Sequence, residues 1–90
     1  MAYYLVSYDL RKPGRDYEEL YAAIKSHTKW ARVLESLWAI STNNSAVQIR
    51  DELSQHVDSN DGLFIIETGS SGAWRHVLCE SQWLKDNLWA

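Results

Sequence analysis

The chain has 90 residues, which is enough for one domain and too few for two. Nine Lys and Arg against twelve Asp and Glu give a net charge of −3, which argues against a protein that coats nucleic acid through overall basicity. One cysteine, Cys79, excludes an intrachain disulfide, and no Cys/His cluster has the spacing of a zinc site.

The first residues have no basic region, and their short apolar run is interrupted by Ser7 and Asp9. Neither a signal peptide nor a membrane span is therefore expected. Together with the single thiol, this pattern predicts a cytoplasmic protein.

The chain begins with a predicted buried strand over residues 3–8, because aromatic and aliphatic side chains fill that segment. Pro13-Gly14 then predicts a turn. Asp16, with Glu19 three residues later, predicts the N-cap of a helix. The apolar positions of this helix share one face at the spacing i, i+3, i+4 and i+7. They are Tyr17, Leu20, Tyr21 and Ile24.

Residues 30–42 form a second β-rich stretch that is too long for one ordinary strand. We expect two strands, over about residues 31–35 and 37–42. They would be separated by a bend or bulge near Glu35-Ser36, although no Gly or Pro marks a turn there.

A second capping box, formed by Ser45 and Gln48, predicts a helix, and residues 63–68 form the last clear strand. The order is therefore β-α-β-β-α-β. This order predicts an α/β (α+β) protein of the ferredoxin-like type, with a four-stranded antiparallel sheet and two helices on one face.

We divide the chain into a ferredoxin-like core over residues 1–68, a Gly/Ser-rich hinge over residues 69–72 and a C-terminal tail over residues 73–90. The apolar side chains of the tail must pack on its own sheet or on that of a second protomer, with residues 80–88 as a short helix. With both core helices on one face, the other sheet face would be apolar and uncovered. An uncovered apolar face predicts a homodimer.

Asp9 directly follows the first strand, where a side chain held by the scaffold can face a cleft. Its carboxylate suits Mg²⁺, although capping of the following turn is the alternative. Arg11, Lys12 and Arg15 lie just beyond it, in the half of the chain with net positive charge. These cations could bind phosphate or could simply belong to a solvated loop.

Other polar residues carry weaker signals. The three histidines have no spacing typical of a metal or catalytic pair, so we expect them at the surface or at helix ends. The bend at Glu35-Ser36, and Asp61 before the last strand, could lie near Asp9 in a compact sheet.

Two segments of the chain resemble a known family. Leu5-Val6-Ser7-Tyr8-Asp9-Leu10, followed by an amphipathic helix and then Leu34-Glu35-Ser36-Leu37-Trp38, resembles the small CRISPR-associated adaptation proteins. The chain is most similar to their SinR-like branch of stand-alone relatives, and more distantly similar to virulence-associated protein D, a toxin-type ribonuclease. The resemblance covers residues 3–68 and does not extend into the tail.

The resemblance implies a ferredoxin-like homodimer in which strand-end aspartates of the two protomers face each other across a cleft. By position, the family aspartate corresponds to Asp9 and the bend serine to Ser36, so both are candidate catalytic residues and Asp9 is the candidate Mg²⁺ ligand. Independently of the resemblance, a nuclease would use the cations of the basic loop, Arg11, Lys12 and Arg15, to bind the phosphate backbone. The acidic second half lacks the basic faces that duplex-binding members use.

Two functions follow from these observations. The first is a Mg²⁺-dependent endonuclease of antiviral defence that acts on RNA or DNA. The second is a catalytically inactive homodimer that binds protein or nucleic acid, of the CRISPR-adaptation or toxin–antitoxin kind. The position of Asp9 and the basic loop favour the first function, whereas the aromatic tail and net acidity favour the second.

Overall fold

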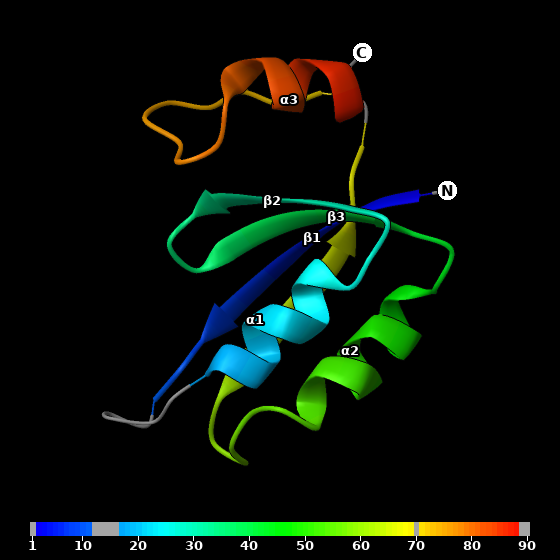
Figure 1. The fold of residues 1–90 in the computed structure, drawn as a ribbon, viewed down its shortest axis with the longest axis vertical. Coiled ribbons are helices and arrows are strands. Elements are labelled where there is room, and N and C mark those ends of the chain that lie inside the picture. Colours follow the sequence, from blue (N-terminus) through cyan, green and yellow to red (C-terminus); the bar gives the residue numbers. More distant parts are fainter. Residues whose placement is uncertain (1, 12–16, 70, 89–90) are drawn as a thin grey trace.

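The computed structural model describes residues 2–11, 17–69 and 71–88. Its four strands form one antiparallel sheet in the order β2-β3-β1-β4 (Figure 1). With three helices, this sheet confirms the α+β class. In chain order the elements are β1 (Ala2–Asp9), α1 (Glu18–Lys25), β2 (Lys29–Leu34), β3 (Leu37–Thr42), α2 (Ala46–Ser54), β4 (Gly62–Glu67) and α3 (Ser81–Asn87).

The division of the second β-rich stretch into two strands is confirmed, and Glu35-Ser36 is the turn between them. The β2–β3 register shifts between Arg32 and Leu34, which places a bulge just before the turn. The backbone N–H of Tyr8 donates to the Ser36 carbonyl at 3.2 Å. This hydrogen bond holds the β2–β3 turn beside the end of β1.

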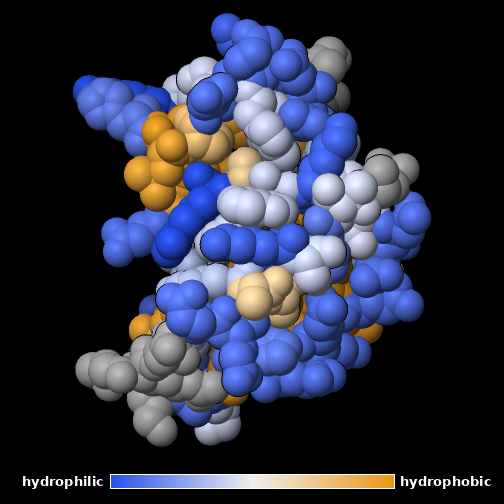
Figure 2. All heavy atoms as spheres, viewed as in Figure 1, coloured by the Kyte–Doolittle hydropathy of each residue, from blue (hydrophilic) through white to orange (hydrophobic). Residues whose placement is uncertain are grey.

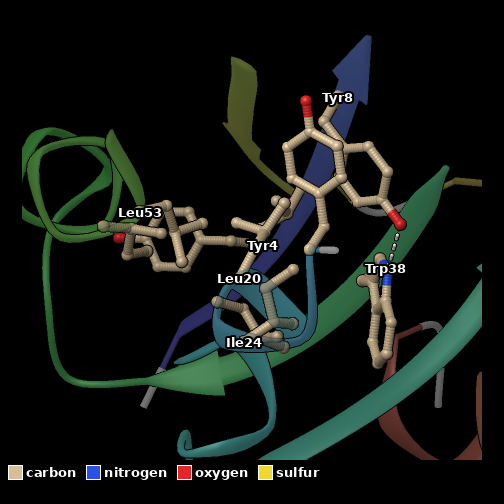
Figure 3. Packing of buried hydrophobic residues seen from close by; sticks show 10 residues of the cluster. Tyr4, Tyr8, Leu20, Ile24, Trp38 and Leu53 are labelled. Carbon is tan, nitrogen blue, oxygen red and sulfur yellow. Dashed lines mark hydrogen bonds between the residues drawn. The ribbon is translucent and has the colours of Figure 1, made fainter. Parts of the chain in front are cut away.

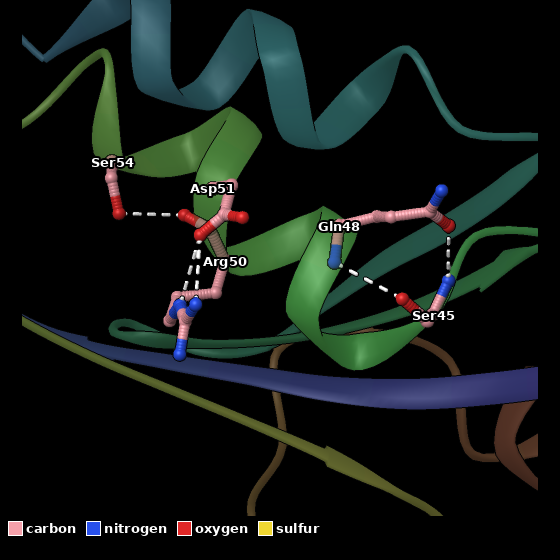
Figure 4. Close-up of polar contacts among 5 residues, drawn as sticks. All are labelled: Ser45, Gln48, Arg50, Asp51 and Ser54. Atoms are coloured by element: carbon pink, nitrogen blue, oxygen red, sulfur yellow. Dashed lines mark hydrogen bonds and ion pairs between the residues drawn. The ribbon is translucent and has the colours of Figure 1, made fainter.

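The two core helices begin differently. Ser45 and Gln48 form the predicted capping box of α2 (Figure 4). The Gln48 backbone N–H donates to Ser45 Oγ at 3.1 Å, and the Ser45 backbone N–H donates to Gln48 Oε1 at 2.8 Å. Helix α1 begins at Glu18 with Tyr17 in the N-cap position and no side-chain capping hydrogen bond. Asp16, the predicted cap, lies outside the described residues.

Helices α1 and α2 lie on one face of the sheet (Figure 1). The apolar faces of both helices and of the central strands meet in the main core (Figure 3). Its buried members are Tyr4, Val6, Tyr8, Tyr17, Leu20, Ile24, Trp38, Ile40, Ile49 and Leu53. Figure 2 shows the outside of this half as predominantly hydrophilic, with apolar atoms in separate patches.

Of the two alternatives for the C-terminal tail, the structure has the tail packed on the chain's own sheet, where it covers part of the second face. Helix α3 and the segment before it lie against the face opposite α1 and α2 (Figure 1). Leu84 and Leu88 pack with Val33 and Ala39 in a second buried cluster. The Leu78 N–H also donates to the Val33 carbonyl at 2.8 Å, which joins the tail to β2. Alternate apolar residues along the strands supply the surface that the tail covers.

Part of the second face stays open beyond the tail. Phe64 and Ile66 of the edge strand β4 are both exposed there, beside Ser7 and Leu5 of β1 in the sheet register. Among the described residues, no helix has the length and apolar character needed to cross a bilayer.

We predict that Leu84→Ala destabilises the fold by about 2–5 kcal/mol, because it leaves a cavity between α3 and the sheet. The matched control is Leu78→Ala, which truncates an exposed leucine of the same tail and should change stability by less than about 0.5 kcal/mol. Urea unfolding followed by circular dichroism measures both. Equal effects of the two variants would mean that α3 does not pack on the sheet.

Candidate functional site

The end of β1, the β2–β3 turn and helix α1 enclose an open depression of about 360 Å³. Its lining residues are Tyr8, Asp9, Leu10, Tyr21, Arg32, Glu35 and Ser36. The fold therefore brings the two candidate catalytic residues, Asp9 and Ser36, to the same depression, together with Glu35 as the sequence suggested.

Asp9 stands at the mouth of this depression with 66% of its side chain exposed. The Arg11 guanidinium donates to Asp9 Oδ2 from Nε at 3.0 Å and from Nη2 at 2.8 Å. Arg11, a predicted phosphate ligand, is thus the counter-ion of the predicted metal ligand. An exposed pair of this kind contributes only about 0–1 kcal/mol, so a metal ion or a phosphate group can displace it.

Asp61 also lies near Asp9, since its neighbour Gly62 pairs with Asp9 in the sheet. Its carboxylate accepts hydrogen bonds from the Arg11 backbone N–H at 2.7 Å and from the Tyr17 hydroxyl at 2.8 Å. These contacts give Asp61 a structural role that joins the loops at this end of the sheet. Lys12 and Arg15, the other two predicted phosphate ligands, lie outside the described residues.

Tyr8 connects the floor of the depression to the core. Its buried hydroxyl accepts a hydrogen bond from Trp38 Nε1 at 3.0 Å (Figure 3) and donates to the Glu35 carbonyl at 3.1 Å. Burial raises the pKa of Tyr8 above its ordinary value of 10.0, against the opposing influence of the Trp38 hydrogen bond and the Arg32 charge. Tyr8 therefore remains a neutral donor at physiological pH.

Arg32 is a candidate site residue that the sequence analysis missed. Its guanidinium donates to the Glu35 carbonyl from Nε at 3.1 Å and from Nη2 at 2.7 Å. Its Cζ atom also lies 5.1 Å from the ring centroids of both Tyr21 and Trp38. Arg32 is thereby held as an oriented cation beside Asp9 and Ser36. The sequence carried a signal for Arg32. It lies in a predicted strand close to the bend at Glu35-Ser36, and strand alternation fixes the sheet face to which its side chain belongs.

The described residues do not bring a complete set of protein ligands for a divalent metal to this depression. Across residues 2–11, 17–69 and 71–88, no group of three or more His, Cys, Asp or Glu side chains could hold a metal ion. Mg²⁺ commonly takes only one or two protein carboxylates and completes its shell with water and substrate oxygens. Asp9 could provide one such carboxylate, and Glu35 lines the same depression.

No protein-family model matches the chain.

We predict that Tyr8→Phe destabilises the protein by about 1–3 kcal/mol, because the buried Trp38 N–H loses its acceptor. The control is Tyr3→Phe, which removes a half-buried hydroxyl whose partner, Asn87, keeps its hydrogen bond to Lys29. Urea unfolding at neutral pH should show the larger loss for Tyr8→Phe. A larger loss for Tyr3→Phe would contradict this role of Tyr8.

The raised pKa of Tyr8 also predicts a pH dependence. Above pH 10.0 the unfolded chain loses the Tyr8 proton while the folded chain retains it. The contribution of the protonated Tyr8 hydroxyl to the free energy of unfolding is therefore complete below pH 10.0, and it is lost as pH rises through the folded-state pKa of Tyr8. Urea unfolding should show that wild type and Tyr8→Phe differ less in their free energy of unfolding as pH rises through this alkaline range. A difference that stays constant would contradict the burial of the hydroxyl.

Proposed function

We propose that the chain is a homodimeric, metal-dependent endonuclease-like protein that acts on RNA or DNA. The observation that carries this proposal is the open depression in which Asp9 and Ser36 lie beside the oriented guanidinium of Arg32. A carboxylate for a metal, a hydroxyl and a cation for the phosphate form a suitable set for phosphodiester cleavage.

We also propose a ferredoxin-like fold and membership of the CRISPR-associated adaptation family, in its SinR-like branch. The strand order β2-β3-β1-β4, with one helix connecting β1 to β2 and another connecting β3 to β4, supports the ferredoxin-like assignment. The family assignment is supported by the Tyr8-Asp9 strand end and by Ser36, which both occur at the depression.

The proposed dimer would use the open part of the second sheet face. Phe64 and Ile66 expose apolar surface on β4, whose outer edge has no neighbouring strand in the described residues. Phe64 also lines a second depression, of about 210 Å³, together with Asp9. A partner seated on Phe64 would therefore approach Asp9, and a twofold axis there would bring two Asp9 carboxylates together.

The Asp9 carboxylates of the two protomers would hold a Mg²⁺ ion, which when bound would supply positive charge to polarise the phosphoryl group and activate water. Asp9 would release Arg11, whose guanidinium would then be available to a phosphate oxygen. Ser36, which lines the same depression, would donate a hydrogen bond to the substrate, and Arg32 would hold a neighbouring phosphate.

A second candidate function is a catalytically inactive homodimer that binds nucleic acid or protein. The two hydrogen bonds from Arg11 to Asp9 favour it, because they satisfy the carboxylate without any metal ion. The same depression would then serve for binding alone.

We predict a dimer in solution. Light scattering at micromolar concentration should give about twice the chain mass of 10.4 kDa. Phe64→Glu should shift the protein to monomer, because it places a charge on the proposed apolar contact. Leu34→Glu, at an exposed leucine on β2 at the opposite edge of the sheet, is the control and should leave the dimer intact. A wild type that remains monomeric at all concentrations would overturn the proposed dimer.

We predict that purified wild type cleaves single-stranded RNA or DNA with Mg²⁺ or Mn²⁺ and not with chelator. Asp9→Asn keeps the size of the side chain but removes the charge, so cleavage should fall to the level seen with chelator. Mg²⁺ should also favour the wild-type dimer but not the Asp9→Asn dimer, because it relieves the repulsion between paired carboxylates.

The matched control for Asp9→Asn is Asp51→Asn. Asp51 lies in helix α2, is 63% exposed and forms an ion pair with Arg50 at 2.9 Å (Figure 4). Its exposure and its pairing with a nearby arginine therefore match those of Asp9. Asp51→Asn should cleave as wild type does. Equal cleavage by wild type and Asp9→Asn would refute Asp9 as the metal ligand, and no cleavage by any variant would favour the inactive binding protein.

A further inference from the structure

Four aromatic rings form a row that leads from the exposed edge of the sheet to the Asp9 depression. Neighbouring ring centroids are 5.7 Å apart for Trp30 and Trp38, 6.1 Å for Trp38 and Tyr21, and 6.2 Å for Tyr21 and Tyr8. The Trp38–Tyr21 pair is stacked, with an interplanar angle of 24°. Trp38 and Tyr8 are buried, whereas Trp30 is exposed and Tyr21 is half-buried.

The sheet and helix geometry explains this row. Trp30 and Arg32 are two residues apart on the edge strand β2, so their side chains project from the same face. Tyr21 and Lys25 are four residues apart on α1, so they also share a side. We call the surface formed by Tyr21, Lys25, Trp30 and Arg32 the aromatic strip, and Trp38 is its floor.

Cations lie along the aromatic strip. Lys25 Nζ is 5.2 Å from the Trp30 ring centroid, and Arg32 Cζ is 5.1 Å from that of Tyr21. Among the described residues, no carboxylate lies within ion-pair distance of Lys25 or Arg32. Arg11 and Arg50, in contrast, are each paired with a neighbouring aspartate. The strip therefore combines the exposed Trp30 and the half-buried Tyr21 with two cations that no carboxylate of the described residues pairs with.

We propose that the aromatic strip binds a single-stranded nucleic-acid segment, with bases stacked on Trp30 and Tyr21 and phosphates at Lys25 and Arg32. Proteins that bind single-stranded nucleic acid combine positive charge for the backbone with aromatic rings on which bases stack, and the strip has both kinds of group. A duplex keeps its bases stacked on one another and cannot offer them to the rings. The strip ends at Arg32 in the Asp9 depression, so a bound strand would lead to the proposed cleavage site. The inference rests on the proposed action on nucleic acid, and it extends that function to a defined binding surface.

The test is fluorescence anisotropy of labelled oligoadenylate, as single-stranded RNA and as DNA, in chelator so that no cleavage occurs. Trp30→Ala should weaken binding about tenfold, as expected for the loss of one stacked base. Trp30→Phe should restore most of the affinity, because it keeps a ring. Lys25→Gln should weaken binding and reduce the slope of log K against log salt by about 0.7, the value for one lost phosphate contact on a single strand.

Matched controls exist in the chain. Leu34 lies on the same strand and is 43% exposed, against 41% for Trp30, so Leu34→Ala tests for general disturbance of β2. Lys85 is the basic residue in the last turn of α3, as Lys25 is in α1, so Lys85→Gln tests for loss of charge elsewhere. Both controls should bind as wild type does, and circular dichroism should show every variant folded.

Binding that is unchanged in a folded Trp30→Ala variant would overturn the proposal. A duplex of the same sequence that binds as tightly, or a polyglutamate peptide that displaces the oligonucleotide equally well, would also overturn it. Failure here is separable from failure of the proposed nuclease. Metal-dependent cleavage that needs Asp9 but not Trp30 refutes the strip alone, whereas Trp30-dependent binding without cleavage by any variant refutes the nuclease alone.

Discussion

Every residue from Trp38 to Thr42 in β3 is buried, with Trp38 and Ile40 in the core under the helices and Ala39 in the cluster under the tail. A strand of this kind needs an apolar layer on both of its faces. Helices α1 and α2 supply one layer, and α3 supplies the other over β2 and β3. The exposed Phe64 and Ile66 mark where the second layer ends, which is why the proposed dimer contact falls on β4.

Trp38 connects this core to the surface. Its ring is almost completely buried, yet its Nε1 donates to Tyr8 and its face lies under Arg32. Tyr8, Tyr21 and Arg32 of the candidate site thus rest on this buried indole. Arg32 is further held by the Glu35 carbonyl, so the same contacts that stabilise the β2–β3 turn also orient the cation.

The distribution of paired and unpaired charges separates two parts of the surface. At the end of β1, Arg11 neutralises Asp9, so a ligand there must first displace an existing ion pair. Along the aromatic strip, Lys25 and Arg32 lie over aromatic rings instead of carboxylates. An acidic protein can therefore attract phosphate at one place, because local charge and not net charge decides the field at short range.

Local pattern was enough to determine the helices, the strands and the α2 capping box, because hydrophobic periodicity and capping depend on residues close in sequence. It also indicated Asp9 at a strand end and Ser36 in a bend. The sequence left open whether the tail covers its own sheet. It did not reveal that Arg11 pairs with Asp9, or that Arg32 and Trp30 line one surface with Tyr21. Those features depend on strand register and on contacts between segments distant in the chain. Only the tertiary structure decides such contacts, because many different partners would satisfy the same local pattern.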